Sequence, residues 1–347
     1  MAPSLANARV GSTTVRTVDW ADGAVMIIDQ TALPATERVL RLSTVEEVVD
    51  AIVRLAVRGA PAIGVAGALG VALAARLYPD DPARLAAAVT ALETARPTAV
   101  NLARGVRLAA AALPEGPEAV LARALELRDA EIEASRQMGQ RGADLVTELC
   151  GSAPRLLTHC NTGGLATVTG GTALAVVAEL HRRGHLGGVV ASETRPLLQG
   201  ARLTAWELGR LGITYRVAVD GAGPFLMARG EIDAVILGAD RICANGDVVN
   251  KVGSYAHALG ARAAGIPFVV VAPESTVDDD TATGADVHIE DRGAAEVLGF
   301  GSARVAPDDA AAVNPAFDVT PHHLVTAIVT DTRVIRPSPP APARSPS

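Results

Sequence analysis

Two polar clusters in the second half of the chain combine side chains that nucleophilic or acid–base chemistry uses. Cys160 stands in the segment Thr158 to Gly164, between an apolar run that predicts a strand and a helix predicted from Thr172. The amides at that helix N-terminus would favour a thiolate. The alternative is a small buried cysteine without a chemical role, which is the usual state of a free thiol.

The second cluster begins with Asp240, directly after the apolar run Ala234 to Leu237. An aspartate at a strand end is either the N-cap of a following helix or a general acid or base in a half-buried pocket. The density of polar groups favours the pocket, because the same connection also carries Asn250 and Lys251. Lys251 is the only lysine among the 31 basic residues of the chain.

A third cluster, Arg58-Gly59-Ala60, precedes Pro61 at the entrance of a predicted helix. Helix amides, small residues and a guanidinium together make an anion site, although the same pattern also suits a tight turn with proline in the first helical turn. Arg96 before Pro97, and Gln199 in a Pro- and Gly-containing segment, are further polar positions at predicted element ends.

The residue spacings predict neither a metal nor an organic cofactor. No second histidine or carboxylate stands at ligand spacing from His159, so we expect His159 to orient a neighbour. The three cysteines form no CxxC pair, which argues against a structural zinc site or a disulfide framework. No GxGxxG follows a predicted strand, which speaks against a dinucleotide enzyme.

The net charge and the hydropathy pattern argue against two classes of partner, nucleic acids and membranes. The 38 acidic and 31 basic residues leave a net charge of −7, so nothing in the charge favours nucleic acid or an anionic membrane. The apolar run Ala60 to Leu77 is rich in Ala and Gly and predicts a buried helix rather than a membrane span. The N-terminus has no apolar stretch typical of a secretory signal, and we therefore expect a cytoplasmic location.

The pattern of elements predicts an α/β protein. Residues 1–125 are expected to form a smaller, mainly helical N-terminal domain with short strands, one of them over Ala35 to Leu42, and a helix capped by Ser43 with Glu46. Residues 126–150 form a connecting helix, part of a long helix from Glu115 to Glu148 that is broken or bent. Residues 151–335 alternate β-branched runs with helical stretches, which predicts a Rossmann-like, doubly wound domain. The Pro- and Ser-rich tail, 336–347, is expected to be disordered.

Taken together, these clusters resemble one family, the methylthioribose-1-phosphate isomerases, which are relatives of the regulatory subunits of the translation initiation guanine-nucleotide exchange factor. The matching stretches cover nearly the whole chain. They include RGAPAIG from 58, ARPTAVNL from 95, LTHCNTG from 157, ETRPLLQGARLTAWEL from 193, GADRICANGDVVNKVGSYA from 238 and NPAFDVTP from 314.

The resemblance implies a role for each cluster. It makes Cys160 and Asp240 the catalytic pair. It implies substrate binding by seven further residues, namely Arg58, Gly59, Ala60, Arg96, Gln199, Asn250 and Lys251. It also implies a homodimer and an activity in methionine salvage that needs no cofactor. Val168 to Gly171 and Ser254 depart from the family pattern, which leaves the exact sugar open.

The reaction that the resemblance implies is the conversion of 5-methylthioribose 1-phosphate to 5-methylthioribulose 1-phosphate. Asp240 would act as acid and base, and Cys160 as a base or as a stabiliser of the transition state. The alternatives are an isomerase of another pentose 1-phosphate, such as 5-deoxyribose 1-phosphate or ribose 1,5-bisphosphate, and a non-catalytic regulatory subunit that binds a sugar phosphate or nucleotide. Retention of both Cys160 and Asp240 argues against the regulatory subunit.

Overall fold

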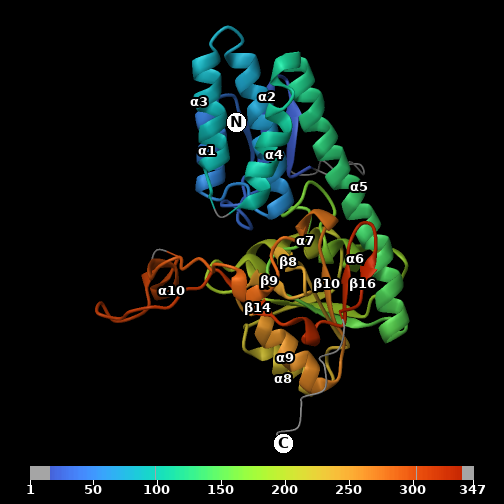
Figure 1. The fold of residues 1–347 in the computed structure, drawn as a ribbon. Coiled ribbons are helices and arrows are strands. Elements are labelled where there is room, and N and C mark those ends of the chain that lie inside the picture. Colours follow the sequence, from blue (N-terminus) through green and yellow to red (C-terminus); the bar gives the residue numbers. More distant parts are fainter. Residues whose placement is uncertain (1–15, 98, 302, 338–347) are drawn as a thin grey trace, which may run out of the picture.

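The computed structural model describes residues 16–97, 99–301 and 303–337 (Figure 1). It is a mixed α/β structure with a helical N-terminal region and a sheet-rich C-terminal region (Figure 1). The predicted disorder of the tail concerns residues that, from 338 onward, lie outside the described part of the chain.

The N-terminal region packs helices on one small antiparallel sheet. Its strands are β1 (Val18–Ala21), β2 (Ala24–Ile28) and β3 (Val39–Leu42), and its helices are α1 (Val45–Val53), α2 (Ala60–Leu77), α3 (Pro82–Thr94) and α4 (Val100–Ala110). The third strand begins later than predicted, because Thr36 closes a turn by donating to the Ala32 carbonyl. The capping box of α1 is also one residue later than predicted and consists of Thr44 and Glu47.

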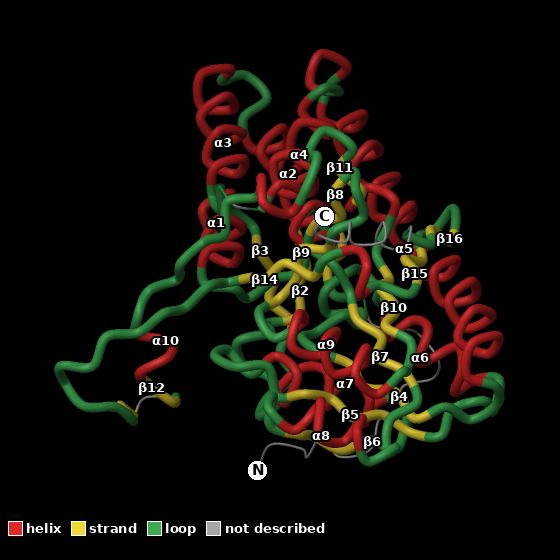
Figure 2. The backbone as a smooth tube through the Cα atoms, turned by 60° about the horizontal axis from the view of Figure 1, so that its bottom comes forward, coloured by secondary structure: helices red, strands yellow, loops and turns green. Residues whose placement is uncertain are grey.

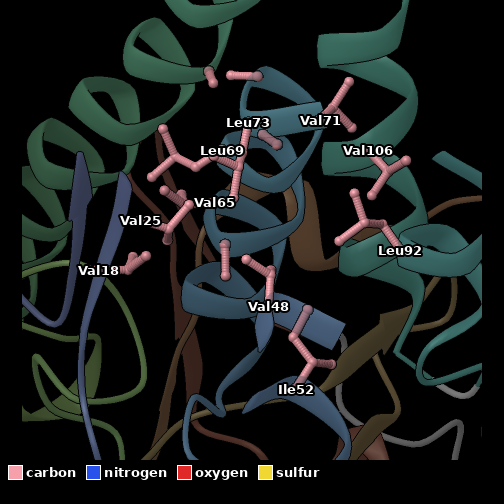
Figure 3. Packing of buried hydrophobic residues seen from close by; sticks show 14 of the residues in the cluster. Val18, Val25, Val48, Ile52, Val65, Leu69, Val71, Leu73, Leu92 and Val106 are labelled. Atoms are coloured by element: carbon pink, nitrogen blue, oxygen red, sulfur yellow. The ribbon is translucent and has the colours of Figure 1, made fainter. Parts of the chain in front are cut away.

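Helix α2 runs through the middle of this region (Figure 3). Its Ala- and Gly-rich faces are small enough for neighbours on every side, and Gly67 and Gly70 admit the side chains of Leu102 and Leu92. By length and composition α2 could also cross a membrane, but 83% of it is buried inside the structure. The predicted buried helix is confirmed.

Helix α5 (Pro117–Cys150) connects the two regions as one unbroken helix of 34 residues (Figure 1). The break, one of the two predicted possibilities, is therefore wrong, and the bend stays a prediction. The glycines that could have interrupted it have a packing role instead, because Gly139 and Gly142 let α5 approach α6 (Ala173–Arg182) closely.

The C-terminal region is built on a seven-stranded sheet with the order β16-β15-β10-β7-β4-β5-β6. All neighbours are parallel except β15 and β16. The bounds are β4 (Arg155–Thr158), β5 (Gly188–Ser192), β6 (Tyr215–Ala218), β7 (Ala234–Leu237), β10 (Phe268–Val271), β15 (Ala327–Val329) and β16 (Val334–Ile335).

Alternate strand residues face two separate helical layers, as the period of a strand requires. Leu156 and Ile236 belong to the core shared with α5 and α6, together with Leu208 of α7 (Ala205–Arg210). Leu157 and Val235 belong to the core shared with α8 (Ala222–Ala228) and α9 (Ser254–Ala264).

The strand order reverses beside β4. The chain passes from β4 to β5 and β6 on one side, whereas β7, β10 and β15 follow on the other. In an open parallel sheet such a reversal leaves a crevice outside the carboxyl ends of the two strands, and ligands bind there. Cys160 follows β4 and Asp240 follows β7, so the fold directs both residues toward this crevice.

A second sheet of four strands, in the order β11-β8-β9-β14, was not predicted. Its strands are β8 (Arg241–Cys243), β9 (Val248–Lys251), β11 (Val277–Asp278) and β14 (Phe317–Thr320). Asp240 leads into β8, so its alternative role as the N-cap of a following helix is wrong. An arm that carries α10 (Ala295–Leu298), β12 (Gly299–Phe300) and β13 (Ala303–Arg304) extends away from the body (Figure 2).

Candidate active site

All nine predicted site residues line one cavity of about 520 Å³. The cavity lies between the N-terminus of α2, the carboxyl ends of β4 and β7, and the small sheet. Segments far apart in the sequence therefore contribute to a single site.

Cys160 occupies a backbone conformation that is unfavourable for a residue with a side chain, with φ of 65°. Two threonine hydroxyls hold it there. The Cys160 N–H donates to Thr194 Oγ1 at 2.9 Å, and the Cys160 carbonyl accepts from Thr204 Oγ1 at 2.7 Å. The helix predicted from Thr172 begins at Ala173, and its N-cap residue Thr172 lines the same cavity as Cys160.

Asp240 is open to the cavity but is otherwise enclosed by protein. Its N–H donates to the Val249 carbonyl at 3.0 Å, which fixes the backbone at the start of the small sheet. Burial raises the pKa of the Asp240 carboxyl, and the positive charges of Lys251, Arg96 and Arg58 oppose that rise. A carboxyl with a raised pKa keeps its proton to a higher pH, which suits a general acid.

Three predicted cations surround the same space. Burial is the main cause that lowers the pKa values of Arg58, Arg96 and Lys251. The pKa of Arg58 is lowered further by the nearby charge of Arg96, and that of Lys251 by Arg58. Cations that crowd one cavity produce a positive potential, which a bound anion would relieve.

Gly59 and Ala60 bring the N-terminus of α2 to the wall of the cavity. Gly59 has φ of 91° and lies against the backbone of Ala166, where an added Cβ would overlap the carbonyl. Pro61 stands in the first turn of the helix. The tight turn and the anion site that the sequence left as alternatives are thus compatible with each other.

Gln199 and Asn250 supply buried amides. Gln199 is 1% exposed, and within the described residues neither atom of its side-chain amide has a hydrogen-bond partner. Asn250 donates to Ser254 Oγ at 2.8 Å. A buried polar group without a partner is costly, so the amide of Gln199 is suited to bind a polar ligand in the cavity.

His159 directly precedes Cys160 in the sequence. It is fully buried, its Nδ1 lies 2.5 Å from Ser192 Oγ and its Nε2 lies 2.8 Å from the Val252 carbonyl. These contacts agree with an orienting role. Among residues 16–97, 99–301 and 303–337, no three His, Cys, Asp or Glu residues are grouped to hold a metal ion.

Sequence reasoning missed Arg292 and Glu207. Arg292 also lines the cavity, and its charge lowers the pKa values of Arg96 and Lys251. It lies in a charged stretch that reads as ordinary surface, so the sequence carried no signal for it. Glu207 accepts a hydrogen bond from Asn161, the residue after Cys160. The sequence feature that could have identified Glu207 is its place in the ETRPLLQGARLTAWEL stretch.

Comparison with known proteins identifies the family. The model of the initiation factor 2 subunit family matches residues 56–337. The chain belongs to this family. The relationship that the sequence motifs indicated is therefore confirmed.

Relatives within the family have names that describe isomerases. The chain is 54% identical to the methylthioribose-1-phosphate isomerase of Anaeromyxobacter sp. (strain K), over 92% of each chain. It is 51% identical to a probable bifunctional methylthioribose-1-phosphate isomerase/methylthioribulose-1-phosphate dehydratase of Nocardia farcinica, of whose length it spans 58%. It is 49% identical to the 5-deoxyribose 1-phosphate isomerase of Moorella thermoacetica, over 92% of this chain and 94% of that protein.

A solved structure agrees with these relatives. The crystal structure of 5-methylthioribose 1-phosphate isomerase from Pyrococcus horikoshii matches with a TM-score of 0.87 at 41% identity. The match covers 93% of this chain and 92% of that one.

Proposed function

We propose that the chain is an aldose–ketose isomerase that converts 5-methylthioribose 1-phosphate to 5-methylthioribulose 1-phosphate in methionine salvage. One observation carries the proposal, the meeting of Cys160 and Asp240 in one cation-lined cavity. Arg58 and Lys251 each lie close enough to interact with both Cys160 and Asp240, and this interaction opposes the lowering of their pKa values by burial. The named relatives support the same reaction.

The anomeric oxygen of this substrate carries the phosphate, so the ring cannot open to a free aldehyde. In the proposed mechanism Asp240 donates its proton to the ring oxygen while the bond from C1 to that oxygen breaks. The electron-poor C1 then promotes loss of hydrogen from C2. In one route the Cys160 thiolate takes it as a proton, an enol phosphate forms, and the Cys160 thiol then returns a proton to C1. In the other route it shifts to C1 as a hydride while Cys160 stabilises the charge. In both routes the C2 hydroxyl gives its proton to the Asp240 carboxylate, so that the ketone forms and Asp240 is protonated again.

The remaining predicted residues bind the substrate in this proposal. Arg58, Arg96, Lys251 and the amides near Gly59 and Ala60 hold the phosphate dianion, since guanidinium groups and helix amides are its preferred partners. The buried side-chain amides of Gln199 and Asn250 bind sugar hydroxyls. Every step proceeds with these side chains alone.

A second candidate substrate is 5-deoxyribose 1-phosphate, which the name of the Moorella relative favours. The reacting end of both sugars is the same, so the difference lies at the 5-position. Steady-state kcat/KM values for 5-methylthioribose 1-phosphate, 5-deoxyribose 1-phosphate and ribose 1,5-bisphosphate decide between them. The proposal expects the highest value for the methylthio sugar.

Substitution of the catalytic pair tests the chemistry. Asp240→Asn and Cys160→Ser should each lower kcat by about two to four orders of magnitude, because each removes a proton-transfer or charge-stabilising group. Circular dichroism checks that the fold is intact. Near wild-type turnover of Asp240→Asn would refute the mechanism, and tight phosphate binding by the wild type without turnover of any sugar would favour a regulatory subunit.

The proposal also covers the fold of the catalytic domain and the oligomeric state. We infer a Rossmann-like, doubly wound catalytic domain over 151–335, supported by the strand order and the two helical layers. We infer a homodimer, supported by apolar side chains exposed on β6 and α8, namely Tyr215, Val217 and Phe225. The cytoplasmic location stays a prediction from the sequence. Light scattering coupled to size-exclusion chromatography tests the dimer.

A further inference from the structure

The loop from Cys160 to Val168 joins the two regions of the protein. Its carbonyls face the N-terminal region, where Leu165 accepts from Gln30 Nε2 at 2.7 Å, Gly164 accepts from Thr17 Oγ1 at 2.6 Å and Ala166 accepts from the Ala62 N–H at 3.2 Å. The position of Cys160 therefore depends on how the other side of this loop is held.

The carboxylate of Glu207, on α7, holds that other side. Glu207 accepts from Asn161 Nδ2 at 2.7 Å and from the Leu165 N–H at 3.3 Å, and the Gly164 N–H is a third donor. An added Cβ at Gly163 would overlap the carboxylate, so the loop is packed directly on it. A carboxylate is the only common side chain that accepts from several donors at once without offering one of its own.

Thr204 links this contact to Cys160 itself. Its hydroxyl donates to the Cys160 carbonyl at 2.7 Å and lies 3.3 Å from Asn161 Nδ2. Thr204 is fully buried at the end of the π-helical turn Gly200–Thr204, which precedes α7. Such turns inside helices are frequent at functional sites, where they redirect side chains.

The surroundings of Glu207 also shift the pKa of its carboxyl. Enclosure raises the pKa of its carboxyl to about 7, although its three N–H donors favour the charged form. Shifted pKa values of this kind occur at functional sites, which agrees with the contacts of Glu207 described above.

We propose that Glu207 and Thr204 are positioning residues that hold Cys160 in its unfavourable backbone conformation at the cavity wall. Glu207 fixes the amides of the loop, and Thr204 fixes the carbonyl of Cys160. Neither residue is among the described residues that line the cavity. The inference rests on the proposed function for its effect on turnover, but not for its effect on the thiol.

The experiment measures the thiol directly. Wild type, Glu207→Gln and Thr204→Val are treated with iodoacetamide, and the alkylation rate of Cys160 is measured by peptide mapping, with Cys150 in the same sample as reference. Release of the loop should raise the Cys160 rate about tenfold relative to Cys150, because the variants lose hydrogen bonds that the closed loop needs. The substitution Glu207→Gln retains the shape of the side chain but places an N–H group against the loop amides.

Steady-state kinetics supply the second measurement. kcat should fall about a hundredfold, as expected when a reacting group is displaced by about 1 Å. KM should stay within about threefold, because the cations that bind phosphate lie on other elements. Glu148→Gln, at an exposed position of α5, serves as the matched control and should change neither quantity.

Each outcome decides one question. Unchanged Cys160 alkylation in folded Glu207→Gln and Thr204→Val would overturn the inference. If Glu207→Gln does not fold, Thr204→Val alone decides, since it removes a hydroxyl without adding a charge or a donor. Wild type that turns over no sugar phosphate would refute the proposed function, and the alkylation rates would still test the positioning of Cys160.

Discussion

Lys251 lies directly opposite Phe317 in the antiparallel pair of β9 and β14, and its ammonium stands 4.7 Å from the centre of the Phe317 ring. The same ammonium donates to the Ala316 carbonyl at 2.5 Å. An aromatic face and a backbone oxygen thus fix a compact charge at the wall of the cavity. The planar guanidinium of arginine, with its larger fork of donors, would need space that these two groups occupy.

Lys251→Arg should therefore weaken substrate binding although the charge is kept. We expect KM to rise about tenfold, since loss of one charged hydrogen bond corresponds to about 1.4 kcal/mol or more. Steady-state kinetics at neutral pH measure the change. The opposite exchange at an exposed position, Arg216→Lys on β6, is the control and should leave KM unaltered. An unaltered KM in Lys251→Arg would mean that the single lysine has no special role.

The pH profile should report the charge state of Asp240. Because the protonated carboxyl is the active form, kcat/KM should fall as the pH rises through the pKa of Asp240. Arg96 is one of the charges that lower this pKa. Arg96→Gln removes that charge and should move the fall to higher pH, by about one unit.

Arg292→Gln provides the matched comparison for this profile. Arg292 also lines the cavity, but it is not among the charges that shift the pKa of Asp240. We expect kcat/KM of Arg292→Gln to fall over the same alkaline pH range as that of the wild type. If the alkaline fall of kcat/KM moved by the same amount in Arg96→Gln and Arg292→Gln, Asp240 would not be the group that titrates.

Gly59→Ala should damage both stability and activity. The substitution places a Cβ against the Ala166 backbone and also forces a side chain into the left-handed region. The two effects together should lower the free energy of unfolding by about 3 kcal/mol. Gly116→Ala separates them, because Gly116 has φ of 99° and open space around an added Cβ. Its cost should be only the backbone strain, about 1 kcal/mol, as measured by urea unfolding.

His257 should make the protein less stable in acid. The residue is 1% exposed, and burial, with a smaller contribution from His159, lowers its pKa from 6.5 to about 3. Between these values the unfolded chain binds a proton that the folded chain rejects, so stability falls as the pH decreases. The loss amounts to about 2 kcal/mol between pH 7 and pH 5. His257→Asn cannot bind this proton, and a plot of unfolding free energy against pH should be flatter by that amount.

The main sheet could be predicted from the sequence because its central strands are buried on both faces. The runs that form β4, β5, β7 and β10 are largely apolar, and the run Ala234 to Leu237 identified in the sequence coincides with β7. The strands of the small sheet are short and partly polar. Arg241 to Lys251 resembles a connecting loop, which is why the hairpin of β8 and β9 was missed.

The site was predicted residue by residue from motifs, but not its geometry. Cys160 and Asp240 could be placed at carboxyl ends of strands, because each follows an apolar run. That these two strands are neighbours depends on the pairing of β4 with β7, which no local pattern encodes. Contacts made across the fold, such as those of Glu207 with the Cys160 loop, lie beyond sequence reasoning for the same reason.

The continuity of α5 ties the folding of the two regions together. Val120 and Ala124, near its start, belong to the helical core, whereas Met138 and Val146 belong to the core beneath the sheet. A helix forms cooperatively, so loss of structure at one end removes support from the other. If the core of one region unfolds, apolar side chains of α5 become exposed. The core of the other region then loses the support of this helix. We therefore expect the helical region and the sheet-rich region to unfold as one unit, although their cores are separate.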